Sequence, residues 1–221
     1  MAMRDRATSA LARQLGHPRG PLGRLVGRIL NRRNAPAVQA AVDALEVRPG
    51  AVLADLGFGG GVGLALLLRR LDGVDRSSGS VQGVDVSETM LAAASRRFRS
   101  AVASGRLRLH LAPVQALPMA DASVDAAITL NTIYFVPDLQ AAFREVHRVL
   151  RPGGRLVVGL GDPQAMARMA VTRDGFLIRP LDDVVAALGS AGLGVTERRR
   201  VGSGEDAVHL LVAARDQAGT G

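Results

Sequence analysis

A glycine-rich turn with a carboxylate in front of it is the first feature of this sequence that could do chemistry. Within the segment 52–63, VLADLGFGGGVG, Asp55 stands two residues before Gly57, and Gly59 and Gly61 follow at alternate positions. Glycines in such a turn let a ligand approach the backbone closely, because no Cβ stands in the way. The Asp55 carboxylate would either order the turn or receive a cationic group of the ligand.

The spacing of these glycines excludes one common nucleotide-binding pattern. A dinucleotide fingerprint G-x-G-x-x-G that starts at Gly57 needs glycine where Val62 stands. One that starts at Gly59 needs glycine or alanine where Leu64 stands. The arrangement acid-x-G-x-G-x-G fits completely, although a turn of this kind also occurs with a purely structural role.

A second carboxylate, Asp85, ends the next β-branched run, GVDVS. In nucleotide-binding sheets an acidic side chain at this place accepts hydrogen bonds from the ribose hydroxyls. Ser87 would then cap a helix that starts at Glu88. A strand-end aspartate alone is more often a cap or a turn residue, but its pairing with the glycine turn favours ribose binding.

Alternating strands and helices must position these carboxylates. Short β-branched runs predict seven strands: Val52–Asp55, Val81–Asp85, Leu107–Leu111, Val124–Leu130, Arg155–Leu160, Gly194–Val201 and Ala207–Ala213. Apolar residues at spacings of three and four predict helices at Val62–Leu71, Ser87–Ser104, Leu139–Leu150 and Leu181–Ala191. Only Gly202–Asp206 separates the last two strands, which is too short for a helix and predicts an antiparallel pair. The expected fold is α/β and Rossmann-like: a seven-stranded, mostly parallel sheet with an antiparallel last strand and helices on both faces.

The first 35 residues differ from the rest in charge. They hold eight arginines against one acid, Asp5, and therefore carry +7 of the net charge of +8. Apolar residues recur at helical spacing within PLGRLVGRILNRRN, with arginines on another face, which predicts an amphipathic helical extension. We expect residues 1–35 to cover the site as a lid. A helix packed on the body with a solvated arginine face, and peripheral membrane contact through residues 20–33, are the alternatives.

Composition excludes several classes of function. The chain has no cysteine, so a thiolate nucleophile and cysteine-bound metal sites are ruled out, and its four histidines lack metal-ligand spacing. Residues 36–221 are nearly neutral and the chain has only six aromatic residues, which argues against nucleic-acid binding. No apolar run is long enough for a signal peptide or a membrane span, so a cytoplasmic location is expected. Residues 36–216 should form one domain with a disordered tail at 217–221.

Four segments together carry a family resemblance: ADLGFGGGVG, GVDVSETML, VQALPMADASVDAAITLNTIYFVPD and FREVHRVLRPGGRLVV. In this order and spacing they resemble the class I S-adenosylmethionine-dependent methyltransferases of the small ubiquinone/menaquinone-biosynthesis-like superfamily. The resemblance covers about residues 36–160. It implies S-adenosylmethionine as cofactor, S-adenosylhomocysteine as product and a small-molecule methyl acceptor. The alternative is an RNA-directed or non-catalytic S-adenosylmethionine-binding module that uses the basic amino-terminal segment.

The resemblance also assigns cofactor contacts. It implies that Asp85 binds the ribose, that Val86 lies against the adenine, and that Asn131 supports the methionine part. The remaining contacts are the methionine-binding turn, Asp55, Gly57, Phe58, Gly59 and Gly61, and the far side of the adenine pocket, Val114 and Gln115. One position departs from the family: Pro113 stands where an aspartate usually bonds the adenine amino group. Adenine recognition must then rely on backbone groups near Val114 or on Gln115.

Residues near the reacting methyl group follow the fourth strand. Tyr134 and Phe135 are the candidate substrate-facing aromatics there, and Met166 and Met169 are candidates from the variable segment 161–180. With Phe176 and the basic extension they would suit a partly apolar, anionic small molecule. Methyl transfer needs a general base only if the accepting atom must lose a proton. Tyr134 and His17 are the candidates for that base, and no metal site is expected.

Overall fold

The computed structural model describes residues 34–217 except residues 75–78 and 174. The basic segment 1–33, which contains His17 and the expected amphipathic lid, lies outside the described residues. Residues 218–221 of the expected tail also lie outside them. No helix in the described part of the chain is both long enough and apolar enough to cross a membrane.

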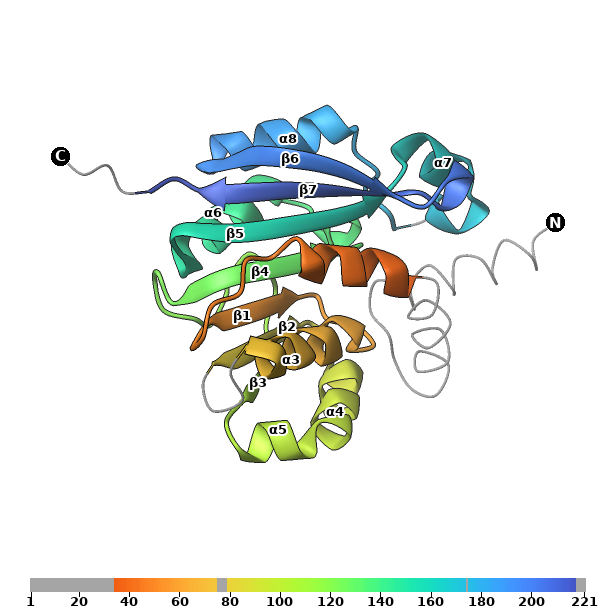
Figure 1. The fold of residues 1–221 in the computed structure, drawn as a ribbon. Coiled ribbons are helices and arrows are strands. Elements are labelled where there is room, and N and C mark those ends of the chain that lie inside the picture. The colour runs from red at the N-terminus through yellow and green to blue at the C-terminus, as the bar shows by residue number, and fades with distance from the viewer. Residues whose placement is uncertain (1–33, 75–78, 174, 218–221) are drawn as a thin grey trace.

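Seven strands form one sheet in the order β3-β2-β1-β4-β5-β7-β6 (Figure 1). Their bounds are β1 Val52–Leu56, β2 Ser80–Asp85, β3 Leu107–Leu111, β4 Val124–Leu130, β5 Leu150–Gly161, β6 Leu193–Val201 and β7 Val208–Arg215. Strands β1 to β5 pair in parallel, whereas β7 is antiparallel to both β5 and β6. The predicted sheet with an antiparallel last strand is therefore confirmed, and the carboxyl ends of its parallel strands point to the side on which α7 (Pro163–Arg168) lies.

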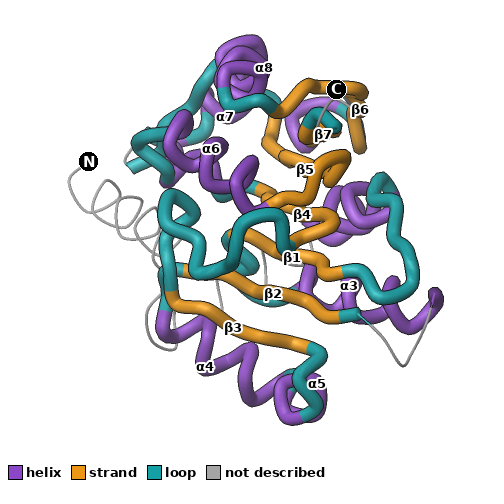
Figure 2. The backbone as a smooth tube through the Cα atoms, turned by 90° about the vertical axis from the view of Figure 1, so that its left-hand side faces the viewer, coloured by secondary structure: helices purple, strands orange, loops and turns teal. Residues whose placement is uncertain are grey.

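Helices cover both faces of the sheet (Figure 2). One face packs against α6 (Leu139–Val149) and α8 (Leu181–Ser190), and the other against α3 (Val62–Val74), α4 (Glu88–Arg97) and a helix over residues 34–43. Strand β5 shows why both faces are apolar: Leu156 and Val158 belong to the first core, while Val157 belongs to the second. This alternation is the two-residue period of a strand that is buried on both sides.

Helix α6 illustrates how local sequence sets an element. Asp138 begins it, and its side chain accepts a hydrogen bond from the Ala141 N–H at 2.8 Å. Ala142, Phe143 and Val146 are buried at spacings of one, three and four along the helix face that meets the sheet. An N-cap aspartate and an apolar stripe are the two signals that predict such a helix.

The helix predicted at Ser87–Ser104 is in fact two helices. Ser87 caps α4, which ends at Arg97, and α5 (Arg99–Ala103) starts after Phe98. Phe98 leaves helical geometry at φ −109° and ψ 26°, and its ring lies beside Gly61 of the glycine turn. Arg97 Nη1 donates to the Gly60 carbonyl at 3.1 Å. The helix thus breaks where Arg97 and Phe98 contact the glycine turn, and the apolar periodicity of the helix sequence does not reveal such a contact.

The segment after β5 holds structure that periodicity missed. Asp162 caps α7 by accepting hydrogen bonds from the N–H groups of Gln164 and Ala165, and Pro163 occupies the first turn. An aspartate followed by proline is a recognisable helix start. Short 3₁₀ turns follow β4 at Ile133–Phe135 (η1), α7 at Ala170–Thr172 (η2) and β6 at Gly204–Asp206 (η3).

Candidate active site

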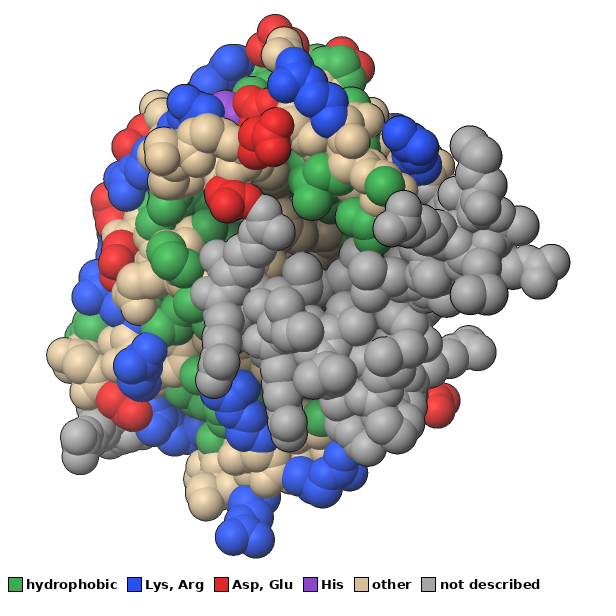
Figure 3. Space-filling view, turned by 90° about the vertical axis from the view of Figure 1, so that its right-hand side faces the viewer, with side chains coloured by type: hydrophobic (Ala, Val, Ile, Leu, Met, Phe, Trp, Pro, Cys, Tyr) green, Lys and Arg blue, Asp and Glu red, His purple; other side chains and the backbone are tan. Residues whose placement is uncertain are grey.

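A cavity of about 680 Å³ lies at the carboxyl ends of the parallel strands. Figure 3 looks onto this side of the molecule, where hydrophobic side chains form part of the visible surface. Most of the residues named from the sequence line this cavity: Asp55, Gly57, Phe58, Gly59, Asp85, Val86, Val114, Gln115, Asn131, Tyr134, Phe135, Met166 and Met169. Gly61 is not part of this lining, and His17 lies outside the described residues.

The three glycines of the turn serve different purposes. Gly57 has φ +79°, and a Cβ there would lie 2.2 Å from Oγ1 of Thr132. Gly61 has φ +75°, and a Cβ there would meet the Phe98 ring at 3.1 Å. At Gly59, with φ +48°, a Cβ would meet no atom within 4 Å. Gly57 and Gly61 therefore allow close packing within the protein, and Gly59 keeps the cavity side of the turn open.

Asp55 is buried beneath the turn, with 4% of its surface exposed. Its carboxylate accepts a hydrogen bond from the Leu64 N–H in the first turn of α3, and a Cβ on Gly63 would lie 2.2 Å from Oδ2. Burial, followed by the charge of Asp85, raises the pKa of Asp55 from 3.8 to about 8, against the opposing effect of the Leu64 bond. Asp55 thus orders the turn and borders the cavity, and at neutral pH its carboxyl is mostly protonated.

Asp85 links the glycine turn to the start of α4. Its Oδ2 accepts from the Gly59 N–H at 2.8 Å, and its Oδ1 accepts from the Ser87 N–H at 2.9 Å. Ser87 in turn accepts from the Met90 N–H at 3.3 Å, as the sequence predicted for the cap. The next residue, Val86, is 42% exposed although it is apolar, and it lines the cavity. An exposed valine beside a polar strand end is a surface on which a flat ring could pack.

The end of β4 turns sharply at Asn131. This residue has φ +58°, which is uncommon for a side chain other than glycine but is tolerated by asparagine. Its N–H donates to the Gly159 carbonyl at 2.8 Å. Thr129 and Thr132 both donate from Oγ1 to the Leu56 carbonyl, at 2.9 and 3.1 Å. These bonds tie the ends of β1 and β4 together.

Three aromatic rings form one wall of the cavity. The Tyr134 and Phe176 ring centroids are 5.7 Å apart, and those of Phe135 and Phe176 are 4.7 Å apart at 63°. Such tilted and edge-to-face contacts suit the quadrupoles of aromatic rings. The Tyr134 hydroxyl accepts a hydrogen bond from the Gly161 N–H at 2.7 Å. Burial raises the pKa of Tyr134 to about 12 against that bond, so the phenol stays protonated at neutral pH.

The histidines of the described chain lie elsewhere. His110 contacts Oε1 of Gln82 at 2.8 Å, and His209 lies 3.2 Å from Oδ2 of Asp162. His147 lies beside Gly192 on the α6 side of the sheet. None of these three histidines is among the cavity-lining residues, so within residues 34–217 no imidazole is available as a base.

Several cavity residues were not among the individually predicted site residues. Glu205 and Asp206 reach the cavity from the turn between β6 and β7, and Asn34, Pro36, Ala37 and Val38 reach it from the helix over 34–43. Turn carboxylates carry no pattern that would mark them, because charged turn residues are ordinary. In the described parts of the chain no group of three or more potential metal ligands is found.

Comparison with known proteins shows what this chain is similar to. Residues 54–158 match the family model described as a methyltransferase domain. Over these residues the chain is similar to methyltransferase domains. It is 31% identical over 119 residues to the ubiquinone/menaquinone biosynthesis C-methyltransferase UbiE of Geotalea daltonii, which covers 53% of the chain and 48% of that relative.

Another relative of the methyltransferase domain is the methyltransferase GfsG of Streptomyces halstedii. The two are 35% identical over 116 residues, which is 52% of this chain and 40% of that relative. The chain spans between 20% and 55% of the length of the first curated relatives it matches. The similarity therefore concerns the domain and not the whole of those proteins.

Solved structures of low identity share the fold of the methyltransferase domain. The geranyl diphosphate C-methyltransferase from Streptomyces coelicolor, in complex with Mg²⁺, geranyl diphosphate and S-adenosylhomocysteine, superposes with a TM-score of 0.70 at 19% identity. The comparison covers 91% of this chain and 86% of that one. A methyltransferase from Haloferax volcanii, in complex with its activator, gives a TM-score of 0.71 at 19% identity.

Proposed function

We propose that this chain is an S-adenosylmethionine-dependent methyltransferase that acts on a small, partly apolar molecule. The observation that carries the proposal is the cavity at the carboxyl ends of β1, β2 and β4, where the glycine turn, Asp85 and Asn131 converge. Ligands of open α/β sheets bind in the crevice at this edge. The glycine spacing fits the acid-x-G-x-G-x-G arrangement and fails the dinucleotide fingerprint.

The residues present fit this cofactor. Gly59 leaves open the space that a Cβ would take, so a ligand can come close to the turn. Asp85, at the carboxyl end of β2, would accept hydrogen bonds from the ribose hydroxyls. The exposed surface of Val86 and the segment 112–115 would hold the adenine, and Asp55 and Asn131 border the methionine end of the cavity.

The acceptor side is apolar. Phe135, Phe176, Met166 and Met169 line the cavity there, and we propose that they hold the ring or chain of the acceptor. The cofactor supplies a methyl group that its sulfonium charge already activates, so the task of the protein is alignment. Positioning of two reactants removes up to about 7–11 kcal/mol of a barrier in well-oriented systems.

Tyr134 is better suited to holding the acceptor than to removing a proton from it. Its phenol accepts the Gly161 N–H and remains protonated at neutral pH, because burial raises its pKa to about 12. A protonated phenol is a poor general base. We propose that Tyr134 positions the acceptor through its ring and hydroxyl, and that the accepting atom either needs no base or loses its proton to another group.

The test is a labelling experiment on a metabolite extract. The protein is incubated with the extract and with S-adenosylmethionine that carries a labelled methyl group, and mass spectrometry detects labelled products. A labelled small molecule that forms with the protein and is absent with the Asp85→Ala variant would support the proposal and identify the acceptor. Binding of the cofactor without any labelled product from extracts of several growth conditions would instead favour a non-catalytic binding module.

A further inference from the structure

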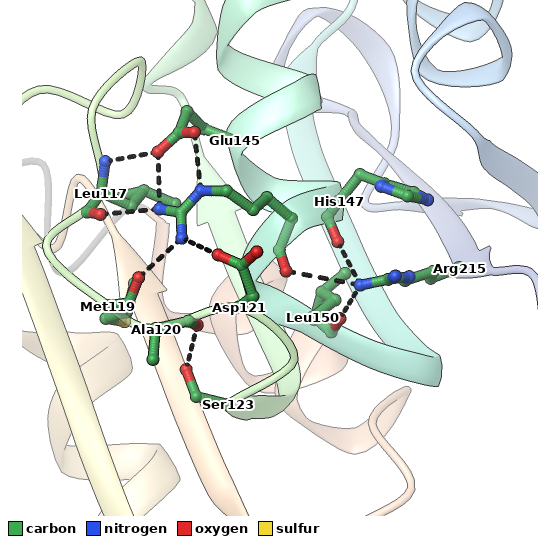
Figure 4. Close-up of polar contacts among 10 residues, drawn as sticks. Leu117, Met119, Ala120, Asp121, Ser123, Glu145, His147, Leu150 and Arg215 are labelled. Atoms are coloured by element: carbon green, nitrogen blue, oxygen red, sulfur yellow. Dashed lines mark hydrogen bonds and ion pairs between the residues drawn. The ribbon is translucent and has the colours of Figure 1, made fainter.

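Arg148, in the last turn of α6, uses all five of its N–H groups within the described chain (Figure 4). Nε and Nη2 donate to the two carboxylate oxygens of Glu145, both at 2.8 Å. Nη2 also donates to the Leu117 carbonyl at 2.9 Å. Nη1 donates to the Met119 carbonyl at 2.8 Å and to Oδ1 of Asp121 at 2.7 Å. A guanidinium has five such donors, so the side chain is held from every side.

Glu145 completes this arrangement from the same face of α6. It lies three residues before Arg148, which places the two side chains next to each other. Its Oε2 also accepts from the Leu117 N–H at 3.0 Å. The Arg148 guanidinium holds the pKa of Glu145 below its usual value, so the carboxylate is ionised at neutral pH. We call Glu145 and Arg148 the clamp.

The clamp holds the segment that lines the adenine side of the cavity. At its other end, this segment is held by the Ala112 N–H, which donates to the Asp85 carbonyl at 3.1 Å. Between Ala112 and Leu117 lie Val114 and Gln115, which line the cavity. The four residues between these two fixed points, 113–116, have little freedom, so the clamp determines where their backbone lies.

The backbone position matters because of the residue at 113. Proline has no N–H and its ring makes no hydrogen bond, so Pro113 offers a ligand only its carbonyl, which already accepts from the Ala116 N–H at 3.1 Å. Among the described residues, neither the N–H groups of Val114 and Gln115 nor the Gln115 side chain has a hydrogen-bond partner. These are the polar groups that remain for a ligand.

We infer that Glu145 and Arg148 are positioning residues that hold the backbone at Val114 and Gln115 in place to recognise the purine base of the cofactor. This inference rests on the proposed function. The clamp does not line the cavity, so it acts through the segment and not by touching the ligand. The strength of a backbone hydrogen bond depends on its distance and angle. A shift of the segment would therefore weaken the hydrogen bond to the purine base and leave the contacts with the ribose and the amino-acid part unchanged.

The experiment compares two ligands on three proteins. Calorimetry gives the dissociation constants of S-adenosylhomocysteine and of S-inosylhomocysteine. In the inosine ligand an oxygen replaces the adenine amino group and N1 carries a proton, so N1 no longer accepts a hydrogen bond from a backbone N–H. The proteins are the wild type, Arg148→Gln and the control Arg151→Gln. Arg151 pairs with Asp125 and has no hydrogen bond to the segment 112–121, so its loss removes an arginine–carboxylate pair at a different place.

We expect the wild type and the control to prefer the adenine ligand by about tenfold, the equivalent of one hydrogen bond. In Arg148→Gln this preference should fall to about twofold, while affinity for the inosine ligand stays within about threefold of the wild type. Hydrogen exchange of residues 112–121 in the ligand-free protein should speed up in Arg148→Gln alone. If Arg148→Gln does not fold, Glu145→Gln, which keeps an oxygen for the Leu117 N–H, serves as the milder variant.

Two results would overturn the inference. One is an unchanged adenine preference in a variant whose segment exchanges faster, and the other is an equal loss of affinity for both ligands, which is what general destabilisation produces. A wild type that binds neither ligand would contradict the proposed function itself. These outcomes are distinguishable because the wild type is measured first.

Discussion

Replacement of Asp55 by asparagine tests the electrostatics of the site most sharply. Burial and the neighbouring Asp85 raise the pKa of Asp55 from 3.8 to about 8. At pH values between about 4 and 8, Asp55 is therefore protonated in the folded protein and ionised in the unfolded chain. The stabilising effect of this proton is fully present below about pH 4 and is lost as the pH rises towards 8.

The magnitude follows from the two pKa values. One proton held by the folded state alone lowers the free energy of unfolding by about 1.4 kcal/mol per pH unit. Between about pH 5 and 7 the contribution of Asp55 should therefore fall by about 2.5 kcal/mol. Asparagine has the shape of the neutral carboxyl group and does not titrate in this range, so Asp55→Asn should lack this decrease.

Urea unfolding of the ligand-free wild type and Asp55→Asn at about pH 5, 6 and 7 measures the difference directly. Other titrating groups are common to both proteins, so they largely cancel when the two free energies are subtracted. The stability of the wild type relative to Asp55→Asn should decline across the series at an unchanged m-value. Parallel pH profiles for the two proteins would refute the reasoning and mean that Asp55 is ionised in the folded protein.

Three further outcomes are expected. Asp85→Ala should raise the dissociation constant of S-adenosylhomocysteine by about 10- to 100-fold in calorimetry, because it removes hydrogen bonds to a charged acceptor, and an unchanged constant would leave Asp85 with a capping role only. Gly57→Ala should lower the Tm by at least about 4 °C, because the new Cβ would lie 2.2 Å from Thr132 Oγ1. Gly59→Ala should lower the Tm less and should impair cofactor binding. Equal Tm losses in the two variants would contradict this reasoning. Tyr134→Phe should leave the shape of the pH profile of kcat unchanged between about pH 7 and 10, because the Tyr134 pKa is about 12.

Much of the fold was predictable because its signals are local. The strands predicted at Leu107–Leu111 and Val124–Leu130 are β3 and β4, with the same bounds. The glycine turn, the Ser87 cap and the short connection before β7 were also predicted from the sequence. In each case the physical cause lies in a few neighbouring residues: the two-residue period of a strand, a helix cap, or a glycine with a positive φ.

The unpredicted features depend on residues far apart in the sequence. The break at Phe98 accompanies contact with Gly61, and the aromatic wall forms because Phe176 returns to pack on Tyr134 and Phe135. Arg148 was predicted only as part of the helix Leu139–Leu150, since nothing near it in the sequence indicates that its guanidinium reaches residues 117–121. Such contacts are set by topology, and a pattern within one segment does not reveal them.

The most direct test of the central claim is the ligand preference of the purified protein in calorimetric titrations. The account predicts that S-adenosylmethionine and S-adenosylhomocysteine bind at one site per chain and that NAD does not compete with them. Tighter binding of NAD, or no binding of either S-adenosyl compound, would contradict the assignment of the glycine turn and Asp85 to this cofactor.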